Sequence, residues 1–289
     1  MIVVSNTFLP ALKRRRVGTK NQIQIAQTEA GDVAYYSTGK KHDLNTNENE
    51  SSDEDDDDYE LDGSTSKPES SITGAIWKPH LNDRLTMFIS GTPGAGKSYL
   101  AKEMINLLPD NLDILLFTAL EEKDGNFDDI KKERLFKVRM VPEILSSITL
   151  KAIREKAKSP QTILLFDDVD KIRDPKIQTL TFSIMNDALA NGRGHEKHDG
   201  KGDIHVICTS HSTNDYKKTK YTFENSNYVA LFPGTTPPLQ MYRIFDKMGL
   251  DRDLCKHIIK LARQQKLRSV IIHKVVPMYI IFGDKIMLL

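Results

Sequence analysis

The stretch that decides the fold spans residues 91–98 and reads Gly91-Thr92-Pro93-Gly94-Ala95-Gly96-Lys97-Ser98. It fits the pattern G-x-x-x-x-G-K-[ST] in full, and its glycines let backbone N–H groups turn inward around phosphate oxygens. Residues 85–90 before it form a short apolar run, and residues 98–108 after it show helical spacing that stops at Pro109. A strand, a glycine-rich loop and a helix whose positive end faces the same anion predict a phosphate-binding P-loop.

The residues of this loop have expected roles in nucleotide binding. Lys97 would reach the β- and γ-phosphates of a nucleoside triphosphate, and the Ser98 hydroxyl would ligate magnesium. The predicted cofactors are therefore ATP and Mg²⁺. The predicted nucleotide-binding set is the whole loop with the residue after it: Gly91, Thr92, Pro93, Gly94, Ala95, Gly96, Lys97, Ser98 and Tyr99.

A second apolar run ends in two carboxylates and reads Ile163-Leu164-Leu165-Phe166-Asp167-Asp168. This pattern predicts a buried strand with both acidic residues at its carboxyl end. Asp167 is expected to hold the magnesium ion through water, as the second acidic element of P-loop enzymes does. Asp168 is expected to orient or deprotonate the attacking water, and the alternative is an aspartate that only forms a turn.

A third apolar run, residues 204–209, leads into Thr209-Ser210-His211. If this strand lies between the loop strand and the acidic strand, its end brings a polar group near the γ-phosphate. Thr209 or Ser210 is then the predicted sensor of the nucleotide, and His211 could assist. The alternative is an ordinary hydrophilic strand exit.

An arginine follows the predicted helix over residues 174–191, in the sequence Asn191-Gly192-Arg193-Gly194. An exposed arginine at such a place can reach the nucleotide of a neighbouring subunit, and characterised arginine fingers contribute ~10³–10⁵ in rate. Arg193 is the first choice for this role, with Arg243 and Arg268 as the other candidates. Any of the three could instead be a plain surface residue.

The order of these segments predicts an α/β fold: a P-loop domain of the additional-strand class, with a mostly parallel central sheet and helices on both faces. The remaining predicted sheet strands are residues 112–118 and 228–232, and a further helix is expected over residues 141–158. A C-terminal helix and strand extension begins at about residue 235. Its expected helices are residues 239–248 and 252–263, and its expected strands are residues 269–273 and 278–282.

Composition divides the chain into an N-terminal segment with two candidate strands (1–39), an acidic disordered linker (40–71) and the P-loop ATPase domain (72–289). Residues 1–71 hold 8 Lys/Arg and 14 Asp/Glu, a net charge of −6, whereas the other residues hold 33 and 26, a net charge of +7. A basic domain favours a polyanionic partner, although solvated helix faces produce the same excess. The cluster Lys13-Arg14-Arg15-Arg16 resembles a nuclear-import or phosphate-binding motif.

Cysteine and apolar patterns exclude several classes of protein. Cys208 and Cys255 are the two cysteines, which gives neither a disulfide framework nor a metal site. His195, His198 and Asp199 fit a glycine-rich loop better than a metal site. The apolar runs are shorter than the ~18 residues that span a bilayer, and a signal-peptide pattern is missing. We therefore expect an intracellular protein without direct membrane insertion.

In the order of its motifs, the chain resembles the FtsK/HerA-type DNA-packaging ATPases of large double-stranded DNA viruses, the poxvirus-like packaging ATPases. The resemblance covers residues 72–289. It rests on the P-loop, on Leu164 to Asp168, on Asn191-Gly192-Arg193, on Val206 to His211, and on Val229-Ala230-Leu231-Phe232-Pro233. Residues 196–201 depart from the pattern as an insertion beside Arg193, and the acidic N-terminal arm is not part of it.

The resemblance implies an ATP-driven motor, acting as a homo-oligomeric ring, that moves double-stranded viral DNA into a capsid. Implied partners are double-stranded DNA and capsid portal-vertex or membrane-associated virion proteins. Implied locations are the viral factory in the host cytoplasm, the nucleus or the virion.

Two rival functions remain from the sequence. One is another additional-strand ATPase, such as a helicase loader or an AAA+ remodeller, but those usually carry a helical lid where this chain returns to strands. The other is a virion component that binds nucleotide as a structural ligand. The intact Lys97, Ser98 and Asp167 argue against it, because a degenerate site usually loses one of them.

Overall fold

The computed structural model describes residues 3–4, 22–27, 33–37, 78–79, 84–119, 127–159, 161–194, 202–211, 216–264, 269–282 and 285–289. The basic cluster at residues 13–16, the acidic linker at residues 40–71, the insertion at residues 196–201 and Arg268 lie outside these ranges.

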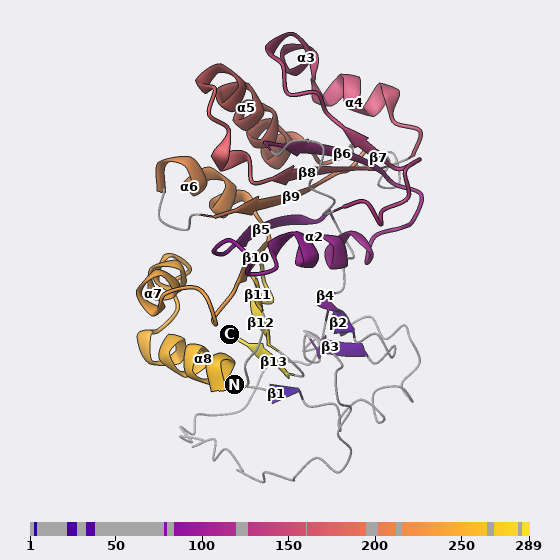
Figure 1. Ribbon diagram of the computed structural model, residues 1–289. Helices are drawn as coiled ribbons and strands as arrows, with labels where there is room; N and C mark the ends of the chain where they lie inside the picture. Colours follow the sequence, from indigo (N-terminus) through magenta and orange to yellow (C-terminus); the bar gives the residue numbers. More distant parts are fainter. Residues whose placement is uncertain are drawn as a thin grey trace, which may run out of the picture.

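The domain is built on a ten-stranded sheet with the order β1-β13-β12-β11-β10-β5-β9-β8-β6-β7 (Figure 1). Its five central strands run parallel to one another. They are β5 (Thr86–Ser90), β6 (Asp113–Thr118), β8 (Thr162–Asp167), β9 (Ile204–Ser210) and β10 (Tyr228–Leu231). β9 therefore lies between the loop strand β5 and the acidic strand β8, which confirms the predicted additional-strand α/β sheet.

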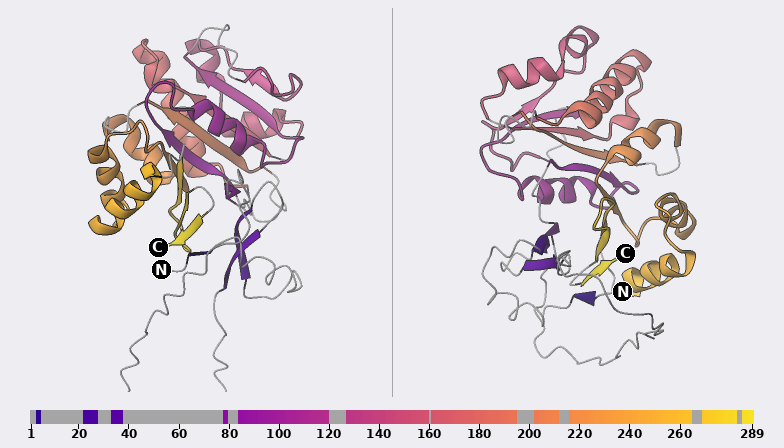
Figure 2. Two further views of the ribbon diagram at one scale, coloured as in Figure 1. Left: turned by 60° about the horizontal axis from the view of Figure 1, so that its bottom comes forward. Right: turned by 180° about the vertical axis from the view of Figure 1, so that it is seen from behind.

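Helices cover both faces of the sheet, as two further views show (Figure 2). α2 (Lys97–Ile105) packs on one face, and α5 (Pro175–Asn191) packs on the other. Along β8, Ile163 and Leu165 belong to the core on the α2 side, whereas Leu164 and Phe166 belong to the core on the α5 side. Because both faces are buried, the strand is apolar from Ile163 to Phe166, up to its acidic end.

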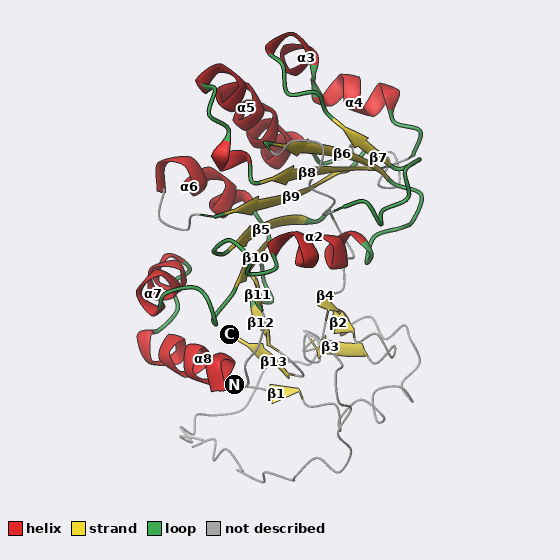
Figure 3. Cartoon of the chain, viewed as in Figure 1, coloured by secondary structure: helices red, strands yellow, loops and turns green. Residues whose placement is uncertain are grey.

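The single helix predicted over residues 141–158 is wrong, because two short helices occupy that stretch (Figure 3). They are α3 (Pro142–Ser147) and α4 (Leu150–Lys156). Ile148 and Thr149 between them have extended backbone, and the Thr149 hydroxyl accepts a hydrogen bond from Ala152 N at 3.1 Å. The threonine therefore acts as an N-cap that starts a second helix, a competition between side chain and backbone that apolar spacing does not reveal.

Three elements have weak sequence signals and were not predicted. β7 (Leu135–Lys137) is a three-residue strand parallel to β6 at the edge of the sheet. α6 (Tyr216–Asn225) is rich in lysine, threonine and tyrosine, so it lacks a clear apolar stripe. β13 (Lys285–Leu288) pairs antiparallel with β12 near the end of the chain.

The C-terminal extension confirms the predicted helices and strands to within a few residues. α7 (Pro238–Lys247) and α8 (Arg252–Gln264) lie side by side (Figure 1). β11 (Val270–His273) pairs antiparallel with β10, and β12 (Tyr279–Phe282) pairs with β11. The extension therefore widens the central sheet.

Strands from the N-terminal segment belong to the large sheet and to a second, smaller sheet. β1 (Val3–Val4) pairs with β13 at the edge of the large sheet. A separate three-stranded antiparallel sheet has the order β3-β2-β4. Its strands are β2 (Gln22–Gln27), β3 (Val33–Ser37) and β4 (Lys78–Pro79).

A buried arginine, Arg84, joins the last turn of α5 to the first residue of β9 by hydrogen bonds. Arg84 Nε donates to Ile204 O at 2.6 Å, Nη1 donates to Leu189 O at 3.1 Å, and Nη2 donates to Ala188 O. Burial lowers the pKa of Arg84 to about 10, which leaves the guanidinium charged at neutral pH. This cation satisfies carbonyl groups in the last turn of α5, where the helix dipole also favours positive charge.

Gly192 leaves the space that this arginine occupies. A Cβ atom at residue 192 would clash with the main-chain oxygen of Ala188 and would lie 2.6 Å from Arg84 Nη2, and the backbone there is otherwise ordinary, with φ −75°. We expect Gly192→Ala to lower the free energy of unfolding by about 1–3 kcal/mol, because the clash displaces a charged hydrogen-bond donor. Chemical denaturation measures the change.

Gly234→Ala is the matched control, because an added Cβ there would have no atom within 4 Å. This control should change stability by less than about 0.5 kcal/mol. Equal stability of the two variants would show that Arg84 moves aside without loss.

Candidate nucleotide site

The P-loop leaves β5 and turns into α2 at the carboxyl edge of the parallel strands. Gly94 and Gly96 have positive φ angles of 76° and 100°, a conformation that side chains disfavour. Gly91 N donates to Ser210 O at 3.2 Å, so a hydrogen bond joins the first residue of the loop to the end of β9. The glycines are therefore needed for the backbone conformation of the loop as well as for the approach of phosphate to its N–H groups.

Phe232 explains why the first loop residue is a glycine. A Cβ atom at Gly91 would lie 2.6 Å from Phe232 Cδ2, and the phenylalanine is 1% exposed. The Phe232-Pro233 element at the end of β10 therefore packs directly under the loop. The sequence placed this element directly after a buried strand. Its contact with Gly91 was not predicted and is seen only in the structure.

Lys97 begins α2 and lies at the centre of the site. Its Nζ atom is 3.4 Å from Thr92 O, 3.3 Å from His211 Nδ1 and 3.8 Å from Asp168 Oδ1. Burial lowers the pKa of Lys97, and the neighbouring carboxylate of Asp168 opposes that shift. The lysine is therefore a desolvated cation, which attracts an anion more strongly than a solvated one.

Asp167, Ser98 and Thr209 meet where the three predicted motifs converge. The Thr209 hydroxyl donates to Asp167 Oδ1 at 2.8 Å, and the Ser98 hydroxyl lies 3.4 Å from the same oxygen. Burial raises the pKa of Asp167, while the hydrogen bond from Thr209 partly offsets that rise. Two oxygen ligands thus face each other across the start of α2.

Asp168 turns away from the strand toward His211. Its φ angle of 50° is left-handed, and its N–H donates to Thr209 Oγ1 at 2.9 Å. This turn brings Asp168 Oδ2 to 2.5 Å from His211 Nε2. With Lys97 Nζ donating to Nδ1, the Nε2–H of the histidine donates to Asp168. The carboxylate therefore lies beside both Lys97 and a second titratable group.

Asp170 is a member of the site that sequence reasoning missed. Its Oδ2 atom accepts hydrogen bonds from the Ser210 hydroxyl and from His211 N, both at 3.1 Å. Ser210, predicted as a sensor with Thr209, is therefore bound to Asp170, whereas Thr209 contacts both acidic residues of the strand end. The signal was present as a third aspartate, two residues after Asp168 in the sequence.

The side chains fit the two implied cofactors. Oxygen ligands from Ser98 and Asp167 suit Mg²⁺, which prefers oxygen, and the raised pKa of Asp167 reflects a buried charge that a cation would stabilise. The loop from Gly91 to Lys97 would hold the phosphates of ATP. When bound, the metal nucleotide supplies an activated phosphoryl group. Tyr99, predicted beside this set, is 49% exposed on α2.

Arg193 lies at the other edge of the sheet from its own P-loop. Gly192 O accepts from Ile204 N at the start of β9, while Thr209 and Ser210 lie at the end of that strand. A strand of this length spans about 20 Å, so Arg193 does not reach the site of its own subunit. Its side chain is exposed, as is Arg243 on α7. A role for either in a neighbouring subunit's site stays a prediction.

Comparison with known proteins identifies the central domain. Residues 87–226 match the family model described as ATPase family associated with various cellular activities (AAA). The chain carries a P-loop ATPase domain. It is 24% identical over 207 residues to "Uncharacterized protein V3" of Sputnik virophage, an alignment that covers 70% of this chain and 76% of that protein.

One solved structure aligns with nearly the whole chain. The cytoplasmic domain of the Thermomonospora curvata type VII secretion ATPase EccC is matched over 98% of this chain and 32% of that chain, at 12% identity and a TM-score of 0.43. The chain thus spans about a third of that protein's matched structure. In the parts that the structure describes, no helix is long and apolar enough to cross a bilayer.

The raised pKa of Asp167 predicts how a neutral replacement behaves. Above that raised pKa, the folded protein holds an ionised, buried carboxylate that the unfolded chain would solvate, and this lowers stability; the penalty vanishes as pH falls into the ordinary range of aspartate. We expect Asp167→Asn to match or exceed the unmodified protein in free energy of unfolding at pH 8, with the difference shrinking toward acidic pH. Its magnesium-dependent ATP hydrolysis should fall to background.

Asp129→Asn is the control for that experiment. Its carboxylate is exposed, and the hydrogen bond from Lys102 lowers its pKa, so the neutral variant should lose a little stability at pH 8 and keep its ATPase activity. Denaturation across pH and an ATPase assay give both readouts. A clear loss of stability in Asp167→Asn at pH 8 would contradict a destabilising buried charge at residue 167.

Proposed function

We propose that the protein is an ATP-hydrolysing motor that translocates double-stranded DNA, with packaging of a viral genome as its role. The observation that carries the hydrolytic part is the cluster in which Thr209 contacts Asp167 and Asp168, and Asp168 contacts Lys97 and His211. The end of β9 is thereby bonded to the acidic strand and lies beside the loop lysine.

This cluster supports a division of chemical roles. Lys97 and the loop N–H groups bind and orient phosphate, and Ser98 and Asp167 supply oxygen ligands. Asp168 is the group that would accept a proton from the attacking water, since it lies beside the phosphate-binding lysine. His211 fixes the orientation of that carboxylate through the 2.5 Å contact.

The architecture after β10 favours a motor over a lid-bearing remodeller. The AAA match ends at residue 226, and the chain continues through α7 and α8 into antiparallel strands that widen the central sheet. In a lid-bearing remodeller, the segment after the last parallel strand would instead be helical, without strands that widen the sheet. The AAA match itself leaves the remodeller as the competing function.

Three observations support DNA as the substrate. The residues outside the N-terminal 71 carry a net charge of +7, which suits a phosphate backbone. The relative with 24% identity belongs to a virophage, which agrees with a viral role although that protein is uncharacterised. The order of the motifs along the chain adds the resemblance to packaging ATPases.

Duplex DNA should stimulate the ATPase. We expect magnesium-dependent ATP hydrolysis that rises with added double-stranded DNA and falls to background in Lys97→Ala, because the variant removes the buried cation that binds phosphate. The steady-state rate with and without duplex measures both effects. Lys102→Ala, which alters a half-buried lysine on the same helix that pairs with Asp129, should leave the rate unchanged.

The two parts of the proposal can fail separately. Robust hydrolysis that ignores every form of DNA would exclude the motor while leaving the ATPase intact. Absent hydrolysis with intact nucleotide binding would instead favour the virion component that uses nucleotide as a structural ligand.

Arg193 is proposed as a finger that acts on a neighbouring subunit, because it lies too far from its own nucleotide. We expect mixtures of Arg193→Ala subunits with Asp168→Asn subunits to regain part of the activity that each variant lacks alone, since a mixed pair then contains one intact site. The ATPase rate as a function of mixing ratio measures this recovery. Absence of recovery in oligomers that contain both variants would exclude Arg193 as a finger in trans.

A further inference from the structure

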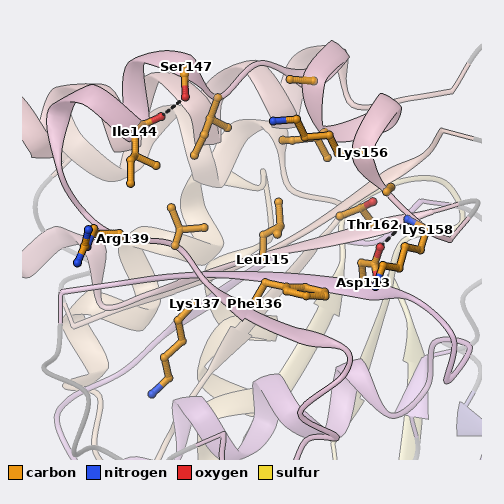
Figure 4. A pocket seen from close by; sticks show the side chains of 15 residues that line it. Asp113, Leu115, Phe136, Lys137, Arg139, Ile144, Ser147, Lys156, Lys158 and Thr162 are labelled. Carbon is orange, nitrogen blue, oxygen red and sulfur yellow. Dashed lines mark hydrogen bonds between the residues drawn. The ribbon is translucent and has the colours of Figure 1, made fainter.

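A groove lies at the β7 edge of the sheet, on the far side of the domain's central strands from the C-terminal extension (Figure 4). It has a volume of about 550 Å³ and lies between strands β6 and β7 and the two short helices α3 and α4. Its wall includes Leu115, Ile148 and Ile153, together with Phe136 and Ile144, which are 39% and 37% exposed. The groove therefore offers apolar surface to a ligand.

The ends of the groove are basic. Arg139 stands at one end, while Lys156 and Lys158 stand at the other, and all three are exposed (Figure 4). Among the described residues, none of these three side chains has a carboxylate partner within 4.0 Å. The acidic side chain in the lining, Asp113, accepts instead from the main-chain N–H of Lys158 at 2.8 Å. An apolar groove with such cations at both ends fits a ligand that combines apolar groups with several negative charges.

The chain contains a segment that combines apolar side chains with several negative charges. Residues 53–62 read Asp-Glu-Asp-Asp-Asp-Asp-Tyr-Glu-Leu-Asp, so Tyr59 and Leu61 are embedded among acidic residues. In an extended segment, residues two apart point to the same side, which places Tyr59 and Leu61 on one side and Glu60 on the other. A DNA backbone has the negative charges but lacks side chains for the apolar wall, so the groove matches the segment better than a duplex.

The position of the segment in the chain permits this contact. It lies between β3 and β4, outside the described residues, and about 17 residues separate Leu61 from Lys78. Such a length extends to roughly 55 Å, whereas a domain of about 200 residues has a radius of gyration of roughly 16 Å. Tethering also gives the segment a high effective concentration at the groove.

We propose that residues 53–62 dock in the groove of their own chain, with Tyr59 and Leu61 against the apolar wall and the carboxylates beside Arg139, Lys156 and Lys158. The assignment does not depend on the proposed function. It pairs the acidic segment with three of the basic residues in the part of the chain whose net charge is +7.

Zero-length carbodiimide cross-linking of the full chain, read out by peptide mass spectrometry, tests the docking. We expect the carboxylates of residues 53–62 to couple to Lys156 and Lys158 at least about fivefold more often than to Lys137, because the tethered segment is concentrated at the groove. Lys137 is the matched control, since it belongs to the lining of the same groove but the ammonium end of its side chain points away from it (Figure 4). A mixture of ¹⁴N and ¹⁵N protein should give cross-links within single chains.

Two variants separate docking from general charge attraction. Tyr59→Ser with Leu61→Ser and, separately, Ile144→Ser each keep every charge of the chain, yet each should remove the preference for Lys156 and Lys158. Cross-links spread evenly over Lys137 and the groove lysines in the unmodified protein would overturn the proposal, as would cross-links only between chains. Protection of Lys156 and Lys158 by added duplex, with no preference for the segment, would make the surface a nucleic-acid site instead.

Discussion

The hydroxyl of Thr209 is the contact on which the rest of the nucleotide site depends. It donates to Asp167 at 2.8 Å and accepts from the N–H of Asp168 at 2.9 Å, in a place where Thr209 is fully buried. One hydroxyl thereby holds the carboxylate of Asp167, the proposed metal ligand, and the turn that carries the second carboxylate. This geometry requires β9 to lie beside β8, because only a neighbour of β8 can place a side chain across both acidic residues.

Burial of charged side chains shifts their pKa values and lowers the stability of the folded protein. Lys97 and Asp167 are both desolvated, and the pKa of the lysine is lowered while that of the aspartate is raised. Each shift means that the charged form is less stable here than in water, so the fold holds charges that a metal nucleotide would stabilise. A site prepared in this way does not need to reorganise when phosphate charge arrives, which is the usual source of electrostatic catalysis.

The sequence predicted the elements whose signals are local and failed where packing decides. The loop, the acidic strand and Thr209 were predicted from apolar runs with polar ends, and the structure brings them together. The break between α3 and α4 at Thr149 was missed. Apolar spacing is continuous through residues 144–153 and predicts one helix, whereas the Thr149 side chain caps a new one. Asp170 and the Phe232 contact with Gly91 were missed because each depends on two strands meeting, which no single segment encodes. The assignment of Arg193 remains untested, since it concerns a second subunit.

The helix α5 connects the two edges of the sheet, and its ends are held by different means. At the carboxyl edge it follows the turn that contains Asp168 and Asp170, whose carboxylates contact His211. At the amino edge Arg84 bonds the carbonyls of its last turn, and Arg154 Nη2 donates to Asn191 O at 2.9 Å and to Arg193 O at 3.1 Å. α5 therefore joins the turn that contains Asp168 to the backbone that carries Arg193, and hydrogen bonds hold the helix at both ends.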